Sequence, residues 1–156
     1  MSALSVAAVQ VTSTEDVGAN LARCADLTRA AAAGGASLVG LPENFAYLGS
    51  DLDHRLSLAE ALPGPGVEAG AAPGPILSAM QALARQTETW LLLGGFPERA
   101  ASAKLVHNTS ILLRADGSIA ATYRKIHLFD VDVPGGKRFR ESESIEPGDD
   151  LVAADT

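Results

Sequence analysis

A strand pattern, a helix pattern and a second strand pattern follow one another at the start of the chain, and this order constrains the fold most strongly. Residues 4–11, LSVAAVQV, are apolar and rich in valine, which predicts a buried strand. Residues 17–31 place apolar side chains at helical spacing, and Gly34 then follows as a helix-ending residue. Residues 37–41 predict another buried strand. Two strands joined by a helix predict a βαβ unit with parallel strands.

The start of the first helix is predicted from its polar residues. Thr12, Ser13 and Thr14 are residue types that cap helices, and Glu15 and Asp16 would then occupy the favourable first turn. We therefore expect the cap within residues 12–14.

The rest of the chain continues the alternation of helix and strand patterns. Asp116-Gly117 is a strong hairpin signal between two strand patterns. Gly94-Gly95 and Pro97 are expected to end the strand that precedes them. The expected elements are helices over 51–60 and 76–88, a loop over 62–75 rich in proline and glycine, strands over 90–96, 107–114 and 118–125, and an irregular stretch over 129–150.

Composition and charge exclude several classes of function. The chain has 156 residues, 47% of them apolar, and a net charge of -7 without a cluster of basic residues, which argues against nucleic acid as a partner. No apolar run is long enough to predict a membrane span, and no basic stretch precedes the first apolar run as in a signal peptide. The one cysteine permits no intrachain disulfide, which fits a reducing compartment. We expect a cytoplasmic protein.

Two charged residues stand where predicted strands end. Glu43 lies in LPEN at 41–44, and Lys125 lies in YRKIH at 123–127. Reactive groups gather at the carboxyl ends of strands in open α/β sheets. A buried carboxylate has a raised pKa and can act as a base near neutral pH, and a neighbouring ammonium can stabilise an oxyanion. Either residue alone is more often a helix cap or a solvated side chain, so only the pair predicts chemistry.

Other candidate sites are weaker. Cys24 falls on the apolar face of the first predicted helix, where a free cysteine is usually a small buried hydrophobe rather than a nucleophile. His107, His127, Asp130 and Asp132 offer nitrogen and oxygen ligands, but their spacing matches no common metal motif. The paired glycines do not form a phosphate-binding loop. We therefore expect no metal and no cofactor.

The series of motifs resembles a known family. It comprises VAAVQVTS at 6–13, GASLVGLPENFAYLG at 35–49, WLLLGGFPER at 90–99, HNTSILLRADGSIAATYRKIHLFDVDVPGG at 107–136 and ESESIEPGDD at 141–150. Together these motifs resemble the nitrilase-like carbon–nitrogen hydrolase superfamily. HLFDVDVPGG and ESESIEPGD resemble the Nit-type amidase branch, which contains omega-amidases and deaminated glutathione amidases.

The resemblance implies a fold and an activity. The implied fold is an α/β, four-layer αββα sandwich that is incomplete in this chain, with residues 1–156 as the N-terminal part of one hydrolase domain, ending before the strand with the family's cysteine. The implied reaction is hydrolysis of the amide bond of a small carboxylate-bearing substrate, with release of ammonia. Family members of this kind form homo-oligomers, so the expected partners are a small-molecule amide and further copies of the chain.

The resemblance also assigns roles to residues. Glu43 matches the general base, and Lys125 matches the lysine that supports the tetrahedral intermediate. The spacing from the PGD motif makes Glu141 the second glutamate, with Glu143 as a neighbouring alternative. The supporting residues implied by the same motifs are Tyr123, His127 and Asn108.

The family's nucleophile has no match in the sequence. The family carries its cysteine in a motif that resembles G-x-x-x-C-Y-D-x-R-F-P, which does not occur here, and Cys24 does not fit that motif. We therefore expect the chain alone to be inactive. The alternative is a non-catalytic fragment, or a binding or assembly subunit that retains the Glu–Lys pocket.

Overall fold

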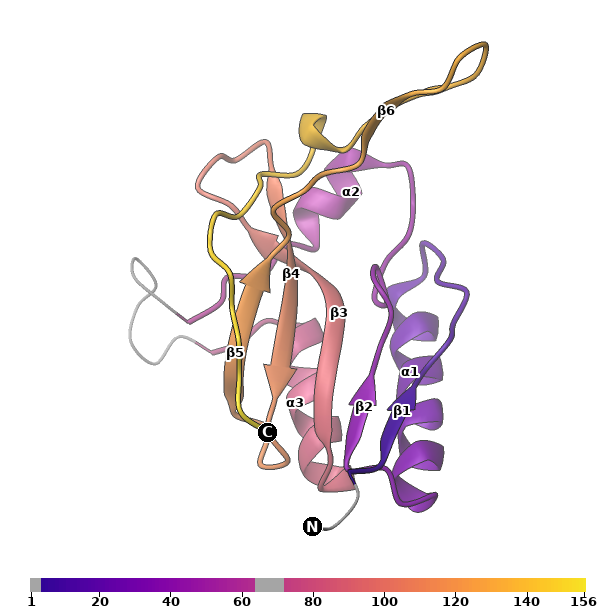
Figure 1. The fold of residues 1–156 in the computed structure, drawn as a ribbon, viewed down its shortest axis with the longest axis vertical. Helices are drawn as coiled ribbons and strands as arrows, with labels where there is room; N and C mark the ends of the chain where they lie inside the picture. The colour runs from indigo at the N-terminus through magenta and orange to yellow at the C-terminus, as the bar shows by residue number, and fades with distance from the viewer. Residues whose placement is uncertain (1–3, 64–71) are drawn as a thin grey trace.

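A five-stranded sheet forms the centre of the computed structural model, which describes residues 4–63 and 72–156 (Figure 1). The strands lie in the order β1-β2-β3-β4-β5. The first three are parallel, and the last two continue the sheet in antiparallel fashion. Their bounds are β1 Val6–Ala8, β2 Leu38–Gly40, β3 Trp90–Arg99, β4 Val106–Leu113 and β5 Ile119–Arg124.

The predicted βαβ unit is confirmed. Helix α1 (Val17–Ala33) connects β1 to β2, and Val6 pairs with Leu38 in a parallel ladder. The predicted cap is wrong by a few residues, since the N-cap is Asp16, whose Oδ1 accepts a hydrogen bond from the Ala19 N–H at 2.9 Å. The helix therefore starts later than the threonines and serine suggested.

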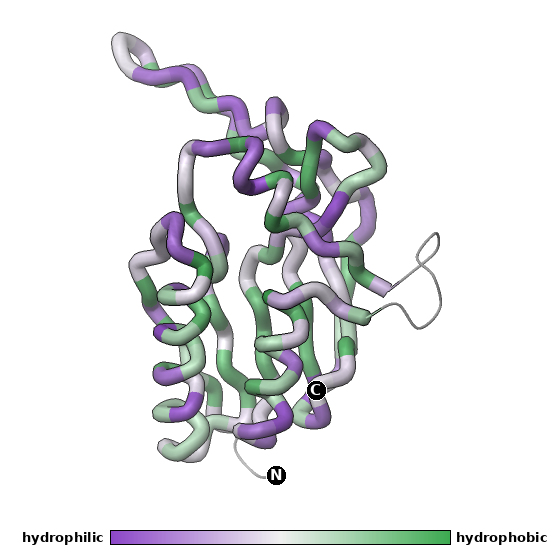
Figure 2. The backbone as a smooth tube through the Cα atoms, turned by 180° about the vertical axis from the view of Figure 1, so that it is seen from behind, coloured by the Kyte–Doolittle hydropathy of each residue, from purple (hydrophilic) through white to green (hydrophobic). Residues whose placement is uncertain are grey.

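Helices cover one face of the sheet. Helix α3 (Pro75–Thr87) packs beside α1. In Figure 2, which shows the helical side of the molecule, both helices lie in front of strands that are mostly hydrophobic. The core between them contains buried residues from every layer: Cys24, Val39, Leu41, Phe45, Ala46, Leu62, Ile76, Leu77, Met80, Leu83, Ala84, Leu91, Leu93, Phe96, Ile111 and Leu113.

A buried glutamate, Glu60, caps the N-terminus of α3. Its N-cap, Gly74, has no side chain to satisfy the first N–H groups of the helix. The Glu60 carboxylate reaches across instead, accepting from Ile76 N at 2.6 Å and from Leu77 N at 3.0 Å. Glu60 follows the short helix α2 (Leu52–Ser57), so this contact ties the two helical segments together. Residues 64–71 of the predicted loop lie outside the described residues.

Two predictions about the strands are wrong. Strand β3 does not end at Gly94-Gly95 and Pro97 but continues to Arg99, because the two glycines form an irregularity at which the pairing with β4 shifts register. The stretch 129–150 is not wholly irregular either. It contains the small antiparallel hairpin of β6 (Asp130–Asp132) and β7 (Arg138–Arg140), which projects from the body in Figure 1, and then the 3₁₀ turn η1 (Glu141–Glu143).

The other face of the sheet is apolar and carries no helix within the described residues. Val6 is 58% exposed and Leu92 is 37% exposed, and the strand register places both side chains on the face opposite α1 and α3. No helix in the described part of the chain is both long enough and apolar enough to cross a membrane.

Candidate functional site

The two strand-end residues predicted from the sequence meet in the structure. Lys125 Nζ lies 3.1 Å from Glu43 Oε1. Asn108 Nδ2 donates to the same carboxylate oxygen at 2.6 Å. Among the described residues, Glu43 Oε2 receives no hydrogen bond, so one oxygen of the carboxylate is available to accept a proton.

The backbone fixes these side chains from neighbouring strands. Lys125 directly follows β5, and its N–H donates to the Asn108 carbonyl on β4 at 2.9 Å. The Lys125 carbonyl accepts from Gly148 N at 3.0 Å. The backbone of Lys125 is therefore fixed by a hydrogen bond at its N–H and another at its carbonyl.

Glycines in β3 let the Glu43 loop approach closely. A Cβ on Gly94 would lie 2.4 Å from the Leu41 carbonyl oxygen. A Cβ on Gly95 would lie 2.8 Å from Asn108 Oδ1 and 3.1 Å from Glu43 Cγ. The glycine pair that was expected to end a strand instead makes room for the catalytic candidates.

A second glutamate completes the cluster. Glu141 begins η1, and its carboxylate lies 2.9 Å from Lys125 Nζ. Its Oε2 also accepts from Phe129 N at 2.6 Å, which fixes the carboxylate to the base of the hairpin. Of the two glutamates predicted here, Glu141 contacts the lysine, whereas Glu143 is exposed on the rim of the same cleft.

The two carboxylates keep the lysine charged. Burial would lower the pKa of Lys125, but the hydrogen bonds to Glu141 and Glu43 outweigh this effect and raise the pKa above its ordinary value. An ammonium has three N–H donors, and two carboxylates accept from it, so one donor remains for a developing oxyanion.

The expectation of a buried base is not met in this chain. The Glu43 side chain is 49% exposed, compared with 27% for Lys125 and 18% for Glu141. Glu43 lines an open cleft, so solvent reaches its carboxylate. Desolvation of this carboxylate therefore requires something further to close over it.

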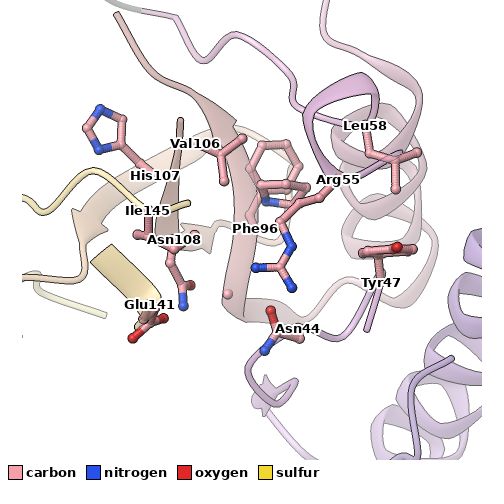
Figure 3. A pocket seen from close by; sticks show the side chains of 12 residues that line it. Asn44, Tyr47, Arg55, Leu58, Phe96, Val106, His107, Asn108, Glu141 and Ile145 are labelled. Atoms are coloured by element: carbon pink, nitrogen blue, oxygen red, sulfur yellow. The ribbon is translucent and has the colours of Figure 1, made fainter. Parts of the chain in front are cut away.

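Two connected hollows surround the cluster. An open cleft of about 730 Å³ contains Glu43, Lys125 and Glu141. A smaller recess of about 50 Å³ shares Asn44, Arg55 and Glu141 with that cleft. Figure 3 shows the recess, whose lining residues are Asn44, Tyr47, Arg55, Leu58, Gly95, Phe96, Pro97, Val106, His107, Asn108, Glu141 and Ile145.

Two predicted supporting residues lie apart from the cluster. Tyr123 lines neither hollow; it lies against Leu151 and Val152, and its hydroxyl accepts from Ile126 N at 3.4 Å. His127 is exposed and also lines neither hollow. Asn108 is the supporting residue that contacts Glu43, and its catalytic role stays a prediction.

The candidate metal ligands do not converge. Within 4–63 and 72–156, no three histidine, cysteine, aspartate or glutamate side chains form a group that could hold an ion. His107 is buried, with Nδ1 2.8 Å from the Glu146 carbonyl. Asp130 accepts from Ser142, and Asp132 pairs with Arg140.

Cys24 lies in the core beneath α1. It is fully buried, and its Sγ lies 3.9 Å from the Phe45 carbonyl. Burial raises the pKa of the thiol to about 11. A thiol in this state is a poor nucleophile, as the sequence position suggested.

Sequence reasoning missed the residues that shape the recess. Arg55 falls within the helix expected over 51–60, and Asn44 within the LPEN motif, and the sequence predicts no role for either. Asn44 has a positive φ of 57°, which asparagine tolerates better than most residues and which turns the loop after Glu43. In the sequence, Asn44 lies 1 residue and Arg55 12 residues after Glu43. Such proximity along the chain does not by itself indicate contact.

The chain is similar to known proteins in sequence and in structure. Residues 5–156 match the carbon–nitrogen hydrolase family. Human deaminated glutathione amidase is 41% identical over 149 residues, which cover 94% of this chain and 42% of the human protein. The structure of Nit3 from Saccharomyces cerevisiae, a member of branch 10 of the nitrilase superfamily, is 29% identical, with a TM-score of 0.78 over 98% of this chain and 51% of Nit3.

A further solved structure is also similar in fold to this chain. The Caenorhabditis elegans NitFhit protein is 29% identical, with a TM-score of 0.77 over 94% of this chain and 34% of that chain. The chain therefore belongs to the carbon–nitrogen hydrolase family. The predicted α/β fold class is confirmed, and the chain spans less than half the length of the human relative.

Proposed function

We propose that this chain supplies the acid–base half of an amidase site, which hydrolyses the amide of a small carboxylate-bearing substrate and releases ammonia. The observation that carries the proposal is the 3.1 Å contact between Glu43 and Lys125 at the ends of a buried strand and a hairpin strand. The human relative's name, deaminated glutathione amidase, supports an amide substrate that carries a carboxylate.

The nucleophile in this proposal is a cysteine outside the 156 residues, since Cys24 is buried in the core. Similar sequence covers 42% of the human relative, which leaves room for such a cysteine elsewhere in the whole protein. A solved amidase of similar fold from Nesterenkonia sp. AN1 has an active-site cysteine to which acrylamide adds.

In the first step, the unpaired oxygen of Glu43 takes the thiol proton as sulfur attacks the amide carbon. The carbonyl oxygen becomes an oxyanion, which accepts a hydrogen bond from the remaining donor of Lys125. The C–N bond then breaks and Glu43 returns the proton to the leaving nitrogen. Ammonia is released, and a thioester between the cysteine and the acyl group remains.

In the second step, water attacks the thioester carbon while Glu43 accepts a proton from it. The C–S bond breaks, the thiol recovers its proton, and the carboxylic acid is released. Glu141 holds the ammonium of Lys125 in place throughout, since its carboxylate accepts a hydrogen bond from Nζ.

Ammonia release by the full gene product that carries this chain tests the proposal. We expect Glu43→Gln and Lys125→Met each to lower turnover by on the order of a thousandfold or more, as in other hydrolases that lose one of several cooperating groups. Cys24→Ala and the exposed control Glu88→Gln are expected to retain activity. Full activity of Glu43→Gln would contradict the proposal.

The second candidate is a non-catalytic binding or assembly subunit. It is favoured by one observation, that the Glu43 side chain is 49% exposed and so lacks the desolvation that raises the pKa of a general base. Reading the gene beyond the codon for Thr156 separates the two candidates. An in-frame Cys-Tyr-Asp motif supports the enzyme, and a stop codon with no turnover by the purified chain supports the subunit.

The exposed sheet face supports a further part of the proposal, that the chain self-associates and that the whole protein is a homo-oligomer. Val6 and Leu92 lie on an apolar face with no helix over it in the described residues. Sedimentation of the purified chain is expected to give species larger than a monomer, and a single sharp monomer boundary would contradict this.

A further inference from the structure

Arg55 lies in the last turn of α2 and lines both the open cleft and the recess beside the Glu43–Lys125 pair. Figure 3 shows its guanidinium extending between Tyr47 and Asn108, toward Asn44. The side chain is half-buried, and its one hydrogen bond among the described residues runs from Nη2 to the Gly49 carbonyl at 3.3 Å.

The other cavity-lining arginines differ from Arg55. Arg138 and Arg140 both pair with Asp132. No carboxylate pairs with Arg55 in residues 4–63 and 72–156. A guanidinium carries five N–H donors in a fixed fork, so most of the hydrogen-bonding capacity of Arg55 faces the hollow unused.

The charges of Glu43, Glu141 and Lys125 favour a cation at the position of Arg55 if the substrate is an anion. Glu43, Glu141 and Lys125 together carry a net charge of -1 when all three are ionised, since two carboxylates face one ammonium. An anionic substrate would be repelled by this set alone. Arg55 lines the same cleft and brings the net charge of these four groups to zero, and its planar fork matches a carboxylate.

We propose that Arg55 is the specificity-determining residue that binds the carboxylate of the substrate, while the amide lies at Glu43 and Lys125. This inference rests on the proposed function and adds the residue that selects the substrate's charge. The recess of about 50 Å³ has room for a group the size of a carboxylate, and Asn108 borders it with the second N–H of its side-chain amide.

The test measures binding by calorimetry to the full gene product that carries this chain, with Glu43→Gln as the common background so that neither amide is hydrolysed. Succinamate is the charged amide, and succinamide is its neutral counterpart. We expect succinamate to bind about tenfold more tightly, which corresponds to about 1.4 kcal/mol from one charge-assisted contact. Arg55→Gln should abolish this preference, and Arg55→Lys should retain part of it, because it keeps the charge but loses the fork.

Arg29→Gln is the matched control, since Arg29 is an exposed arginine on α1 that pairs with Asp26, and its preference should equal that of the Glu43→Gln background. A full preference in Arg55→Gln, or equal binding of the two ligands to the Glu43→Gln background, overturns the role of Arg55 and leaves the amide site standing. Binding of neither ligand at millimolar concentration overturns the proposed function as well. Should circular dichroism find Arg55→Gln unfolded, an undiminished preference in folded Arg55→Lys overturns the proposal and a reduced one supports it.

Discussion

Two consecutive residues, Arg124 and Lys125, make ion pairs of opposite character. Arg124 pairs with Glu98, whose side chain is 6% exposed and also accepts a hydrogen bond from Thr109 at 2.6 Å. Lys125 instead meets two carboxylates, and one of them is half exposed. The first cluster is balanced in charge and its carboxylate is buried, whereas the second has an excess negative charge and its Glu43 carboxylate opens into a cleft.

This contrast separates a structural ion pair from a reactive one. Burial alone would raise the pKa of Glu98, but hydrogen bonds from Arg124 and Thr109 outweigh it and lower the pKa. A carboxylate held in this way is a poor base. The Glu43 carboxylate keeps one oxygen without a donor among the described residues, so it can exchange a proton with a substrate.

Breaking the ion pair between Arg124 and the buried Glu98 is expected to have the largest effect on stability. Arg124→Met leaves Glu98 buried without its cation, so we expect a loss of about 2–3 kcal/mol in the free energy of unfolding, less than for a fully buried pair because Arg124 is half exposed. Lys125→Met is expected to change stability by less than about 1 kcal/mol, because its cluster is open to solvent. Urea unfolding of both variants checks the difference, and equal losses would remove the distinction.

A smaller effect is expected where the glycine pair meets the open cluster. Gly95→Ala places a methyl group 2.8 Å from Asn108 Oδ1, so the loop with Glu43 must shift, at a cost of about 1–2 kcal/mol. Gly18→Ala in α1 is the control; its methyl group meets Asp16 Oδ1 at 3.4 Å, and it should be neutral or stabilising. Thermal unfolding measures both, and an unchanged melting temperature for Gly95→Ala would contradict the close packing.

The smallest effect concerns pH. The lowered pKa of Glu98 means that its contribution to stability is complete above the ordinary glutamate value of about 4.3 and is lost as pH falls through the lowered pKa. Glu98→Gln should therefore flatten the acid side of the stability curve. Urea unfolding at a series of acid pH values tests this, and a variant with the unaltered slope would assign the acid sensitivity to other groups.

Local patterns predicted most of the secondary structure and the two ends of the site. The valine-rich strands, the helix of the βαβ unit and the Asp116-Gly117 turn depend on side-chain periodicity and turn chemistry, which neighbouring residues determine. Strand β3 was predicted too short, because a glycine pair usually weakens a strand and the close approach of Leu41 that requires it is a tertiary contact.

The sequence by itself determined the order of the elements and the placing of Glu43 and Lys125 at strand ends, because strand and turn propensities are local. Only the tertiary structure decided which glutamate joins the lysine, which supporting residue contacts Glu43, and that Arg55 enters the same hollow. These outcomes depend on segments separated by up to 82 residues, whose proximity follows from strand order and register rather than from spacing along the chain.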